Sequence, residues 1–130
     1  MTTRRPLNGA DSLQTRYLLN KTAIDKDIPF FHGAVYGLEG RAMTIIPGKT
    51  ACLRCMYHGP VPEEKFPVIG VTPAVIGSIQ AAEVIKYIVG IGELLTNRLL
   101  MYDGLRLKFT EFKVKKNPNC EHCGRLTGKE

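Results

Sequence analysis

The chain has 130 residues, of which 44% are hydrophobic and 23% are charged, and its formal net charge is +6. This length and apolar content suit one domain with a buried core, or a piece of a larger domain, and exclude a disordered tail or a disulfide-only miniprotein. The positive charge permits binding to nucleic acid or to an acidic partner, but indicates neither by itself.

The first part of the chain predicts a leader followed by a helix. Residues 1–10 have no hydrophobic periodicity, and we interpret them as a leader or a truncation junction. No apolar run follows the charges near the start, so no secretory signal is predicted and the cytoplasm is the expected compartment. A helix is predicted from Ser12 to a point between Asn20 and Ala23, with Ser12 or Asp11 as its cap.

Two strands and a polar loop are predicted next. Residues 28–36 are rich in aromatic and β-branched side chains, and residues 42–46 form a second strand after a turn bounded by glycines. His32 lies within the first of these strands, where we interpret it as a satisfied core histidine. Residues 58–67 contain several prolines and are expected to form an irregular loop.

The strongest helix signal begins at Thr72, which is predicted as the N-cap. Pro73 suits the first turn, and Gly90 is expected to end the helix. The apolar sequence is interrupted by three polar residues: Gln80, Glu83 and Lys86. This pattern predicts a mostly buried helix with one narrow polar stripe, and it excludes a membrane span.

A β-hairpin is predicted from residues 98–102 and 106–114, with Asp103 and Gly104 as its turn. The basic residues near its end alternate with an apolar one: Lys113, Val114, Lys115 and then Lys116. We interpret these lysines as the solvated face of an edge strand.

All four cysteines of the chain occur in two CxxC motifs: Cys52, Cys55, Cys120 and Cys123. A two-residue gap lets both thiolates of one motif reach the same tetrahedral ion, and four thiolates leave no open position for catalysis. The sequence therefore predicts one structural Zn²⁺ site that joins two distant parts of the chain. Two disulfides or a redox CxxC are the alternatives, which a reducing compartment and the doubled motif disfavour. With four sulfurs available, His58 and His122 are not needed as ligands.

Several short motifs follow one another in a characteristic order: DSLQTRYLLN at 11–20, PFFHGA at 29–34, GRAMTIIPG at 40–48, CLRC at 52–55, PAVIGSIQAAEVIK at 73–86, LMYD at 100–103 and NPNCEHCG at 117–124. In this combination the chain resembles the molybdopterin-synthase and thiamine-biosynthesis adenylyltransferases, which are related to the ubiquitin-activating enzymes. The resemblance covers nearly everything from Asp11 to Gly124.

The resemblance implies an α/β fold, namely the C-terminal half of a Rossmann-like, ubiquitin-activating-enzyme-type domain. It implies a mixed sheet, a long covering helix and the four-cysteine zinc site, with residues 11–124 in the domain and 125–130 as a tail. The complete enzyme would use ATP and Mg²⁺ to adenylylate the C-terminal glycine of a ubiquitin-like sulfur carrier protein. Because relatives are homodimers, self-association is expected.

The resemblance also carries over to individual residues. Asp11 matches the family's aspartate that helps to hold magnesium and the ATP phosphates, a role that suits a hard oxygen ligand. The residues alone would favour a helix cap at Asp11 instead. Arg16 and Asn20 also match family positions, for which we expect supporting packing or hydrogen-bonding roles.

Two parts of the family pattern are missing. A Gly-rich strand-to-helix turn for the nucleotide is absent, since Gly90 and Gly92 follow a helix. The chain alone is therefore predicted not to adenylylate anything. Residues 58–72 contain no cysteine that would act as a nucleophile, and no catalytic residue is assigned.

The predicted function is therefore ATP-dependent activation of a sulfur carrier, carried out by a protein of which this chain is the C-terminal part. The alternative is a non-catalytic, zinc-stabilised module that binds the carrier or dimerises. A nucleic-acid-binding zinc ribbon is disfavoured, because the two CxxC motifs are far apart and the aromatic residues do not alternate with the basic ones. A membrane partner is not expected.

Overall fold

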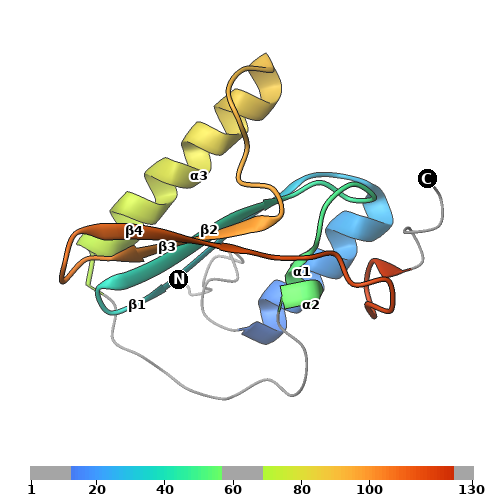
Figure 1. Cartoon of the computed structure of the whole chain (residues 1–130), viewed down its shortest axis with the longest axis horizontal. Coiled ribbons are helices and arrows are strands. Elements are labelled where there is room, and N and C mark those ends of the chain that lie inside the picture. The colour runs from blue at the N-terminus through green and yellow to red at the C-terminus, as the bar shows by residue number, and fades with distance from the viewer. Residues whose placement is uncertain (1–12, 57–68, 125–130) are drawn as a thin grey trace, which may run out of the picture.

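The computed structural model describes residues 13–56 and 69–124 (Figure 1). In chain order the elements are α1 (Leu13–Lys26), β1 (Phe30–Tyr36), β2 (Glu39–Ile45), α2 (Leu53–Met56), α3 (Val71–Val89), β3 (Arg98–Asp103) and β4 (Lys108–Lys113). The α/β class and the order of the predicted helices and strands are confirmed, and α2 is a short addition at the first CxxC motif. None of the helices in the described part of the chain combines the length and apolar character that a bilayer crossing requires.

The four strands form one sheet in the order β1-β2-β3-β4. Each neighbouring pair is antiparallel, because each connection between sheet neighbours reverses the direction of the chain. Parallel pairing in the described residues is confined to a single bridge between Thr44 and Thr96, so the mixed character expected for the sheet is limited to this bridge. β4 is an edge strand, as the lysine pattern predicted, and all six of its residues are exposed. Lys115 is exposed and Val114 is buried just beyond its end, which keeps the predicted alternation.

The long helix α3 covers one face of the sheet across β1 and β2 (Figure 1). Glycines in the strands allow the close approach, because a Cβ atom on Gly40 would clash with Ile76. A Cβ atom on Gly33 would lie 2.6 Å from the side-chain carbon of Gln80. The Gln80 amide fills this space and donates a hydrogen bond to the Phe31 carbonyl at 2.9 Å.

The orientation predicted for α3 is wrong. Its buried residues are Thr72, Ile76 and Glu83, whereas Ile85 and Ile88 are 58% and 74% exposed. The helix therefore turns its polar stripe toward the sheet and most of its apolar face outward. The physical reason is that the polar side chains of the stripe have specific hydrogen-bond partners on the sheet and the neighbouring loops.

The start of α3 also differs from the prediction. The N-cap residue is Gly70, without a side-chain cap, and the Thr72 hydroxyl instead donates to the Gly37 carbonyl at 2.7 Å. A distant acceptor in the β1–β2 turn thus replaces the local capping bond. At the other end, Gly90 stops the helix as predicted, with a φ of 82°.

Helix α1 is longer than the predicted range. It continues to Lys26 because Ala23 and Ile24, in its last turn, are buried in the core. Asp27 follows with a φ of 60°, a conformation that ends a helix.

The β3–β4 hairpin has a longer loop than the predicted two-residue turn. The strand register pairs Asp103 with Lys108, so residues 104–107 form the connection. The Asp103 carboxylate accepts the backbone N–H groups of Leu105 and Arg106 at 3.0 and 3.3 Å and thereby shapes the loop. Gly104 is needed for close packing, because a Cβ atom there would lie 2.7 Å from the Leu38 carbonyl oxygen.

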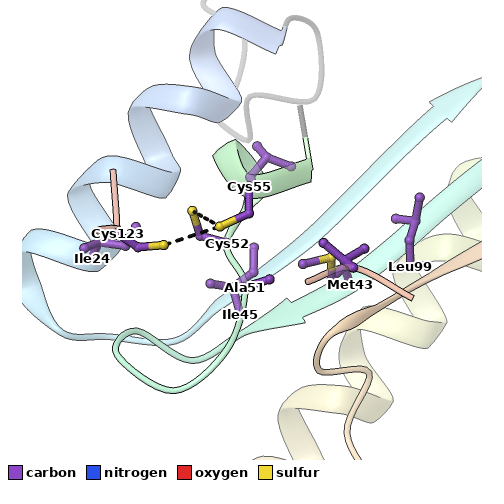
Figure 2. Close-up of a cluster of buried hydrophobic side chains, with 10 residues drawn as sticks. Ile24, Met43, Ile45, Ala51, Cys52, Cys55, Leu99 and Cys123 are labelled. Carbon is purple, nitrogen blue, oxygen red and sulfur yellow. Dashed lines mark hydrogen bonds between the residues drawn. The ribbon is translucent and has the colours of Figure 1, made fainter. Parts of the chain in front are cut away.

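The hydrophobic core lies beside the two cysteine motifs (Figure 2). Its buried residues come from α1, β2, β3, both motifs and the residues next to the first motif and to β4: Ile24, Met43, Ile45, Ala51, Cys52, Leu53, Cys55, Leu99, Val114 and Cys123. Three of the four cysteines thus belong to the main core of the chain.

Candidate metal centre

The first CxxC motif is held at the end of β2 by a tight turn. The Thr50 hydroxyl accepts a hydrogen bond from the Ile46 N–H at 3.0 Å, and the Ala51 N–H donates to the Asn97 side chain at 2.7 Å. The Cys55 N–H then donates to the Cys52 carbonyl at 3.1 Å, which closes the turn of α2. The two sulfur atoms of this motif consequently lie 3.8 Å apart on one side.

The second motif lies in a compact turn after β4. The Cys120 N–H donates to the Asn117 carbonyl, and the Gly124 N–H donates to the Cys120 carbonyl, each at 3.0 Å. Two backbone N–H groups also point at sulfur, since Asn117 donates to Cys55 Sγ and His122 donates to Cys120 Sγ, each at 3.4 Å. Backbone donors of this kind stabilise thiolate charge.

The four sulfur atoms form one cluster. Cys52 and Cys120 are 3.6 Å apart, Cys55 and Cys123 are 3.4 Å apart, and all four sulfurs lie within 4.8 Å of one another. Tetrahedral zinc with Zn–S bonds of about 2.3 Å requires sulfur–sulfur distances of about 3.8 Å. The residues therefore fit a four-thiolate metal site. All four cysteines are free in this structure, so the two-disulfide alternative is not what the chain adopts here.

Proton affinity in the cluster is strongly perturbed. The thiols of Cys123 and Cys52 donate hydrogen bonds to Cys55, which hold the pKa of Cys55 well below its ordinary value. Hydrogen bonds to Cys52 and Cys55, together with burial, raise the pKa of Cys123 far above its ordinary value. Four thiolates at these distances repel one another, so a divalent cation between them is needed for all four to ionise. Metal binding itself stays a prediction.

Helix α1 lines the cluster with two side chains, Tyr17 and Asn20. The Arg54 guanidinium lies 4.3 Å from the centre of the Tyr17 ring, and His122 meets the same ring edge-on at 6.2 Å. Asn20 contacts both motifs, with its Oδ1 atom 3.0 Å from the Leu53 N–H and its Nδ2 atom 2.7 Å from His122 Nδ1. His122 is thus placed beside Asn20, and its exclusion from the set of metal ligands stays a prediction.

An ion pair bridges the two motifs at the surface. Arg54 Nη2 lies 3.1 Å from Glu121 Oε1, but the Glu121 side chain is 69% exposed. Because water screens such a pair, we expect Glu121→Gln to lower the free energy of unfolding by no more than about 1 kcal/mol and to leave the metal content unchanged. Urea unfolding and metal analysis of the purified variant would check this. Loss of the metal would contradict it.

A second polar cluster was not recognised in the sequence. The carboxylate of Glu83, which is 3% exposed, accepts hydrogen bonds from the Thr44 hydroxyl and the Leu95 N–H, each at 2.6 Å. Lys86 Nζ lies 2.6 Å from its other oxygen. Burial alone would raise the pKa of Glu83, but the contacts with Leu95, Lys86 and Thr44 outweigh it and lower the pKa. The sequence signal for this pair was the i,i+3 spacing of Glu83 and Lys86.

The remaining predicted residues have different outcomes. His32 is buried in β1 as expected, and burial, followed by the nearby Arg16 and Arg41, lowers its pKa to about 3. It is therefore neutral at neutral pH. Asp11 and His58 lie outside the described residues, so the nucleotide role of Asp11 stays a prediction.

The sequence matches one protein family over most of its length. The pattern of the ThiF family matches residues 7–122. The SAMP-activating enzyme E1 of Haloferax volcanii is 39% identical over 124 residues, which cover 91% of this chain and 46% of that protein. The sulfur carrier protein adenylyltransferase of Thermus thermophilus is 36% identical over 129 residues, which cover 91% of this chain and 48% of that protein. The chain thus spans about half the length of these two relatives.

Structural comparison agrees at the level of the fold. The crystal structure of E. coli MccB superimposes with a TM-score of 0.72 at 20% sequence identity, over 94% of this chain and 37% of that one.

A further sequence relative is the adenylyltransferase and sulfurtransferase MOCS3 of Drosophila persimilis, which is 34% identical over 90% of this chain and 28% of its own length.

Proposed function

Because the chain belongs to the ThiF family, we propose that it is the metal-bearing part of an adenylyltransferase that activates a ubiquitin-like sulfur carrier protein. The observation that carries this proposal is the match to enzymes named as carrier-activating and adenylyltransferase proteins, at 34–39% identity over nine-tenths of the chain. In the complete protein, the C-terminal glycine carboxylate of the carrier would attack the α-phosphate of ATP, forming a mixed anhydride with AMP and releasing pyrophosphate as the α–β phosphoanhydride bond breaks.

We assign Zn²⁺ to the cluster of Cys52, Cys55, Cys120 and Cys123. A shell of four thiolates offers no open coordination position, so the ion would hold the two motifs together rather than take part in the reaction. The reducing cytoplasm is the compartment that suits four free thiols.

ATP and Mg²⁺ belong to the complete enzyme. The magnesium ion would neutralise the phosphate charge, and Asp11 would supply one oxygen ligand for it. Asp11 precedes α1 by two residues, so the docking of α1 against β1 and α2 would help to place this carboxylate. We infer that the rest of the nucleotide site is formed by the half of the family fold that this chain does not span.

A homodimer is part of this proposal. The outward face of α3 carries large exposed apolar side chains, including Ile85, Ile88 and Val89. Contiguous apolar surface of this kind is normally covered by another part of a larger assembly.

The activity of the chain alone provides one test. We expect the purified chain, mixed with MgATP and a sulfur carrier protein, to show no ATP–pyrophosphate exchange above background, because it lacks the Gly-rich phosphate-binding turn. A full-length relative, such as the Thermus thermophilus enzyme, serves as the positive control with the same carrier. Robust exchange by the chain alone would show that it is not a partial domain.

The alternative function is a non-catalytic module that binds the carrier or dimerises. Calorimetry of carrier binding separates the two when the chain is measured alone and again with the missing half supplied. An enzyme part should bind the carrier weakly alone and gain affinity from MgATP only with the missing half. Tight carrier binding by the chain alone, unaffected by nucleotide, would favour the module.

A further inference from the structure

We propose that Asn20 is a positioning residue that joins α1 to both halves of the metal centre, so that metal binding and the docking of α1 are a single event. Docking of α1 would then depend on the structural ion, although α1 supplies no metal ligand.

The Asn20 amide contacts both cysteine motifs. Leu53 directly follows the first cysteine of one motif, and its N–H donates to Asn20 Oδ1 at 3.0 Å. His122 directly precedes the last cysteine of the other motif, and its Nδ1 atom lies 2.7 Å from Asn20 Nδ2. A carboxamide is a side chain that accepts at one atom while donating at the other, so a single residue links both motifs.

Burial shows that this link lies inside the protein. The Asn20 side chain is 0% exposed, so water does not compete for its amide. A buried amide that lost either partner would leave an unsatisfied polar group, at a cost of about 1–3 kcal/mol. Both motifs must therefore be in place before Asn20 is fully satisfied.

Helix α1 buries few apolar side chains of its own. Its buried residues between positions 14 and 26 are Arg16, Asn20, Ala23 and Ile24, so its buried apolar side chains are one alanine and one isoleucine. Leu18, a larger apolar residue, is 64% exposed. With so little apolar area buried, the attachment of α1 depends strongly on its buried polar residues, of which Asn20 contacts both motifs, and on the packing of Tyr17 beside the motifs.

Removal of the metal would release this attachment. Without the ion, the contacts described between the two motifs are weak ones: thiol hydrogen bonds, the Asn117 N–H on Cys55 Sγ and the exposed Arg54–Glu121 ion pair. His122 would then be fixed less firmly opposite Asn20. If the proposed function holds, a loosened α1 would also affect its N-terminal end, where Asp11 would hold the magnesium ion of ATP. Leu13 lies seven residues before Asn20, or about 10 Å along the helix, and Asp11 precedes it.

Two variants of Asn20 separate its two hydrogen bonds. Asn20→Leu keeps a similar volume but makes neither bond. Asn20→Asp keeps the acceptor for the Leu53 N–H but loses the donor to His122 and adds a charge beside the thiolates. Thr22→Ala is the matched control, because Thr22 is an exposed residue on the same helix.

The readouts are the absorption of the Co²⁺-substituted cluster, the affinity for Zn²⁺ in competition with a chelator, and amide hydrogen exchange in α1. We expect Asn20→Leu to weaken Zn²⁺ binding by about 10- to 100-fold, in the range found for other residues that orient metal ligands. Exchange in α1 should accelerate, while exchange in α3 and β1 should not. Asn20→Asp should show a smaller loss, and Thr22→Ala should resemble the parent chain.

A double-mutant cycle with His122→Phe tests the coupling directly. If Asn20 acts through His122, the loss of affinity in the double variant should be smaller than the sum of the two single losses. Two results would overturn the proposal: parental zinc affinity and α1 protection in both Asn20 variants, or fully additive losses in the cycle. If Asn20→Leu fails to fold, Asn20→Asp and the cycle built on it decide the question. None of these readouts uses ATP or a carrier, so they stand or fall separately from the proposed function.

Discussion

Replacement of Cys123 by serine is expected to abolish stoichiometric metal binding and to unfold the chain around the cluster. Cys123 is 1% exposed and belongs to the hydrophobic core as well as to the sulfur cluster. Structural zinc sites in small domains contribute about 10–16 kcal/mol at neutral pH. That contribution is as large as the whole stability of an ordinary domain, about 5–15 kcal/mol. The loss of one ligand should therefore remove most of the cooperative thermal transition.

Metal analysis of the purified protein and a thermal melt would check this expectation. Ser78→Ala is a suitable control, because Ser78 is an exposed position on α3. The double variant Cys52→Ser/Cys123→Ser should be no less stable than either single variant, since the first loss already empties the site. A chelator should lower the melting temperature of the parent chain, whereas a thiol reductant should not. The opposite pattern, or a Cys123→Ser chain with one bound zinc, would contradict the metal site.

Replacement of Glu83 by alanine is expected to be the most destabilising change away from the cysteines. The substitution strands the Leu95 N–H and the Thr44 hydroxyl in a buried place, each at a cost of about 1–3 kcal/mol. Lys86 also loses its partner, but it is 30% exposed, so water compensates in part. Glu83→Gln keeps an acceptor for Leu95 and should cost less, on the order of 1–2 kcal/mol.

The pH dependence gives a second signature for Glu83. Its pKa in the folded chain lies below the ordinary value of 4.5, so its contribution to stability is fully present above that value and is lost as the pH falls through the folded-state pKa. The difference between the parent chain and Glu83→Gln should therefore shrink in acid. Urea unfolding at neutral and acidic pH measures it, with exposed Glu93→Gln as the control. Equal effects of the two glutamine variants would disprove the role of Glu83.

The clustering of the four cysteines could be predicted from the sequence because it follows from residue type and spacing. Cysteine pairs two residues apart have few uses in a reducing compartment, whatever fold lies between them. The order of helices and strands could also be predicted from the sequence, since glycines, prolines and apolar periodicity are local signals.

The orientation of α3 on the sheet could not be predicted from the sequence in this way. Helical periodicity separates the two faces of a helix but does not say which face packs when the polar face finds partners elsewhere in the fold. Glu83 is satisfied by Leu95 and Thr44, and Thr72 by Gly37, all of which come from other elements or loops. Such contacts depend on tertiary structure, which overrides local propensity.

The position of the two cysteine motifs also sets the order of events during synthesis. Cys55 and Cys123 are in contact but are 68 residues apart in the sequence. At about 5–20 residues per second, the ribosome needs roughly 3–14 s to deliver the second motif after the first. Throughout that interval the first pair of thiols holds only half a coordination shell. With the Zn²⁺ site proposed above, maturation of the chain would be tied to the zinc supply once residue 123 emerges, and a metal-starved cell would accumulate chains with an open core.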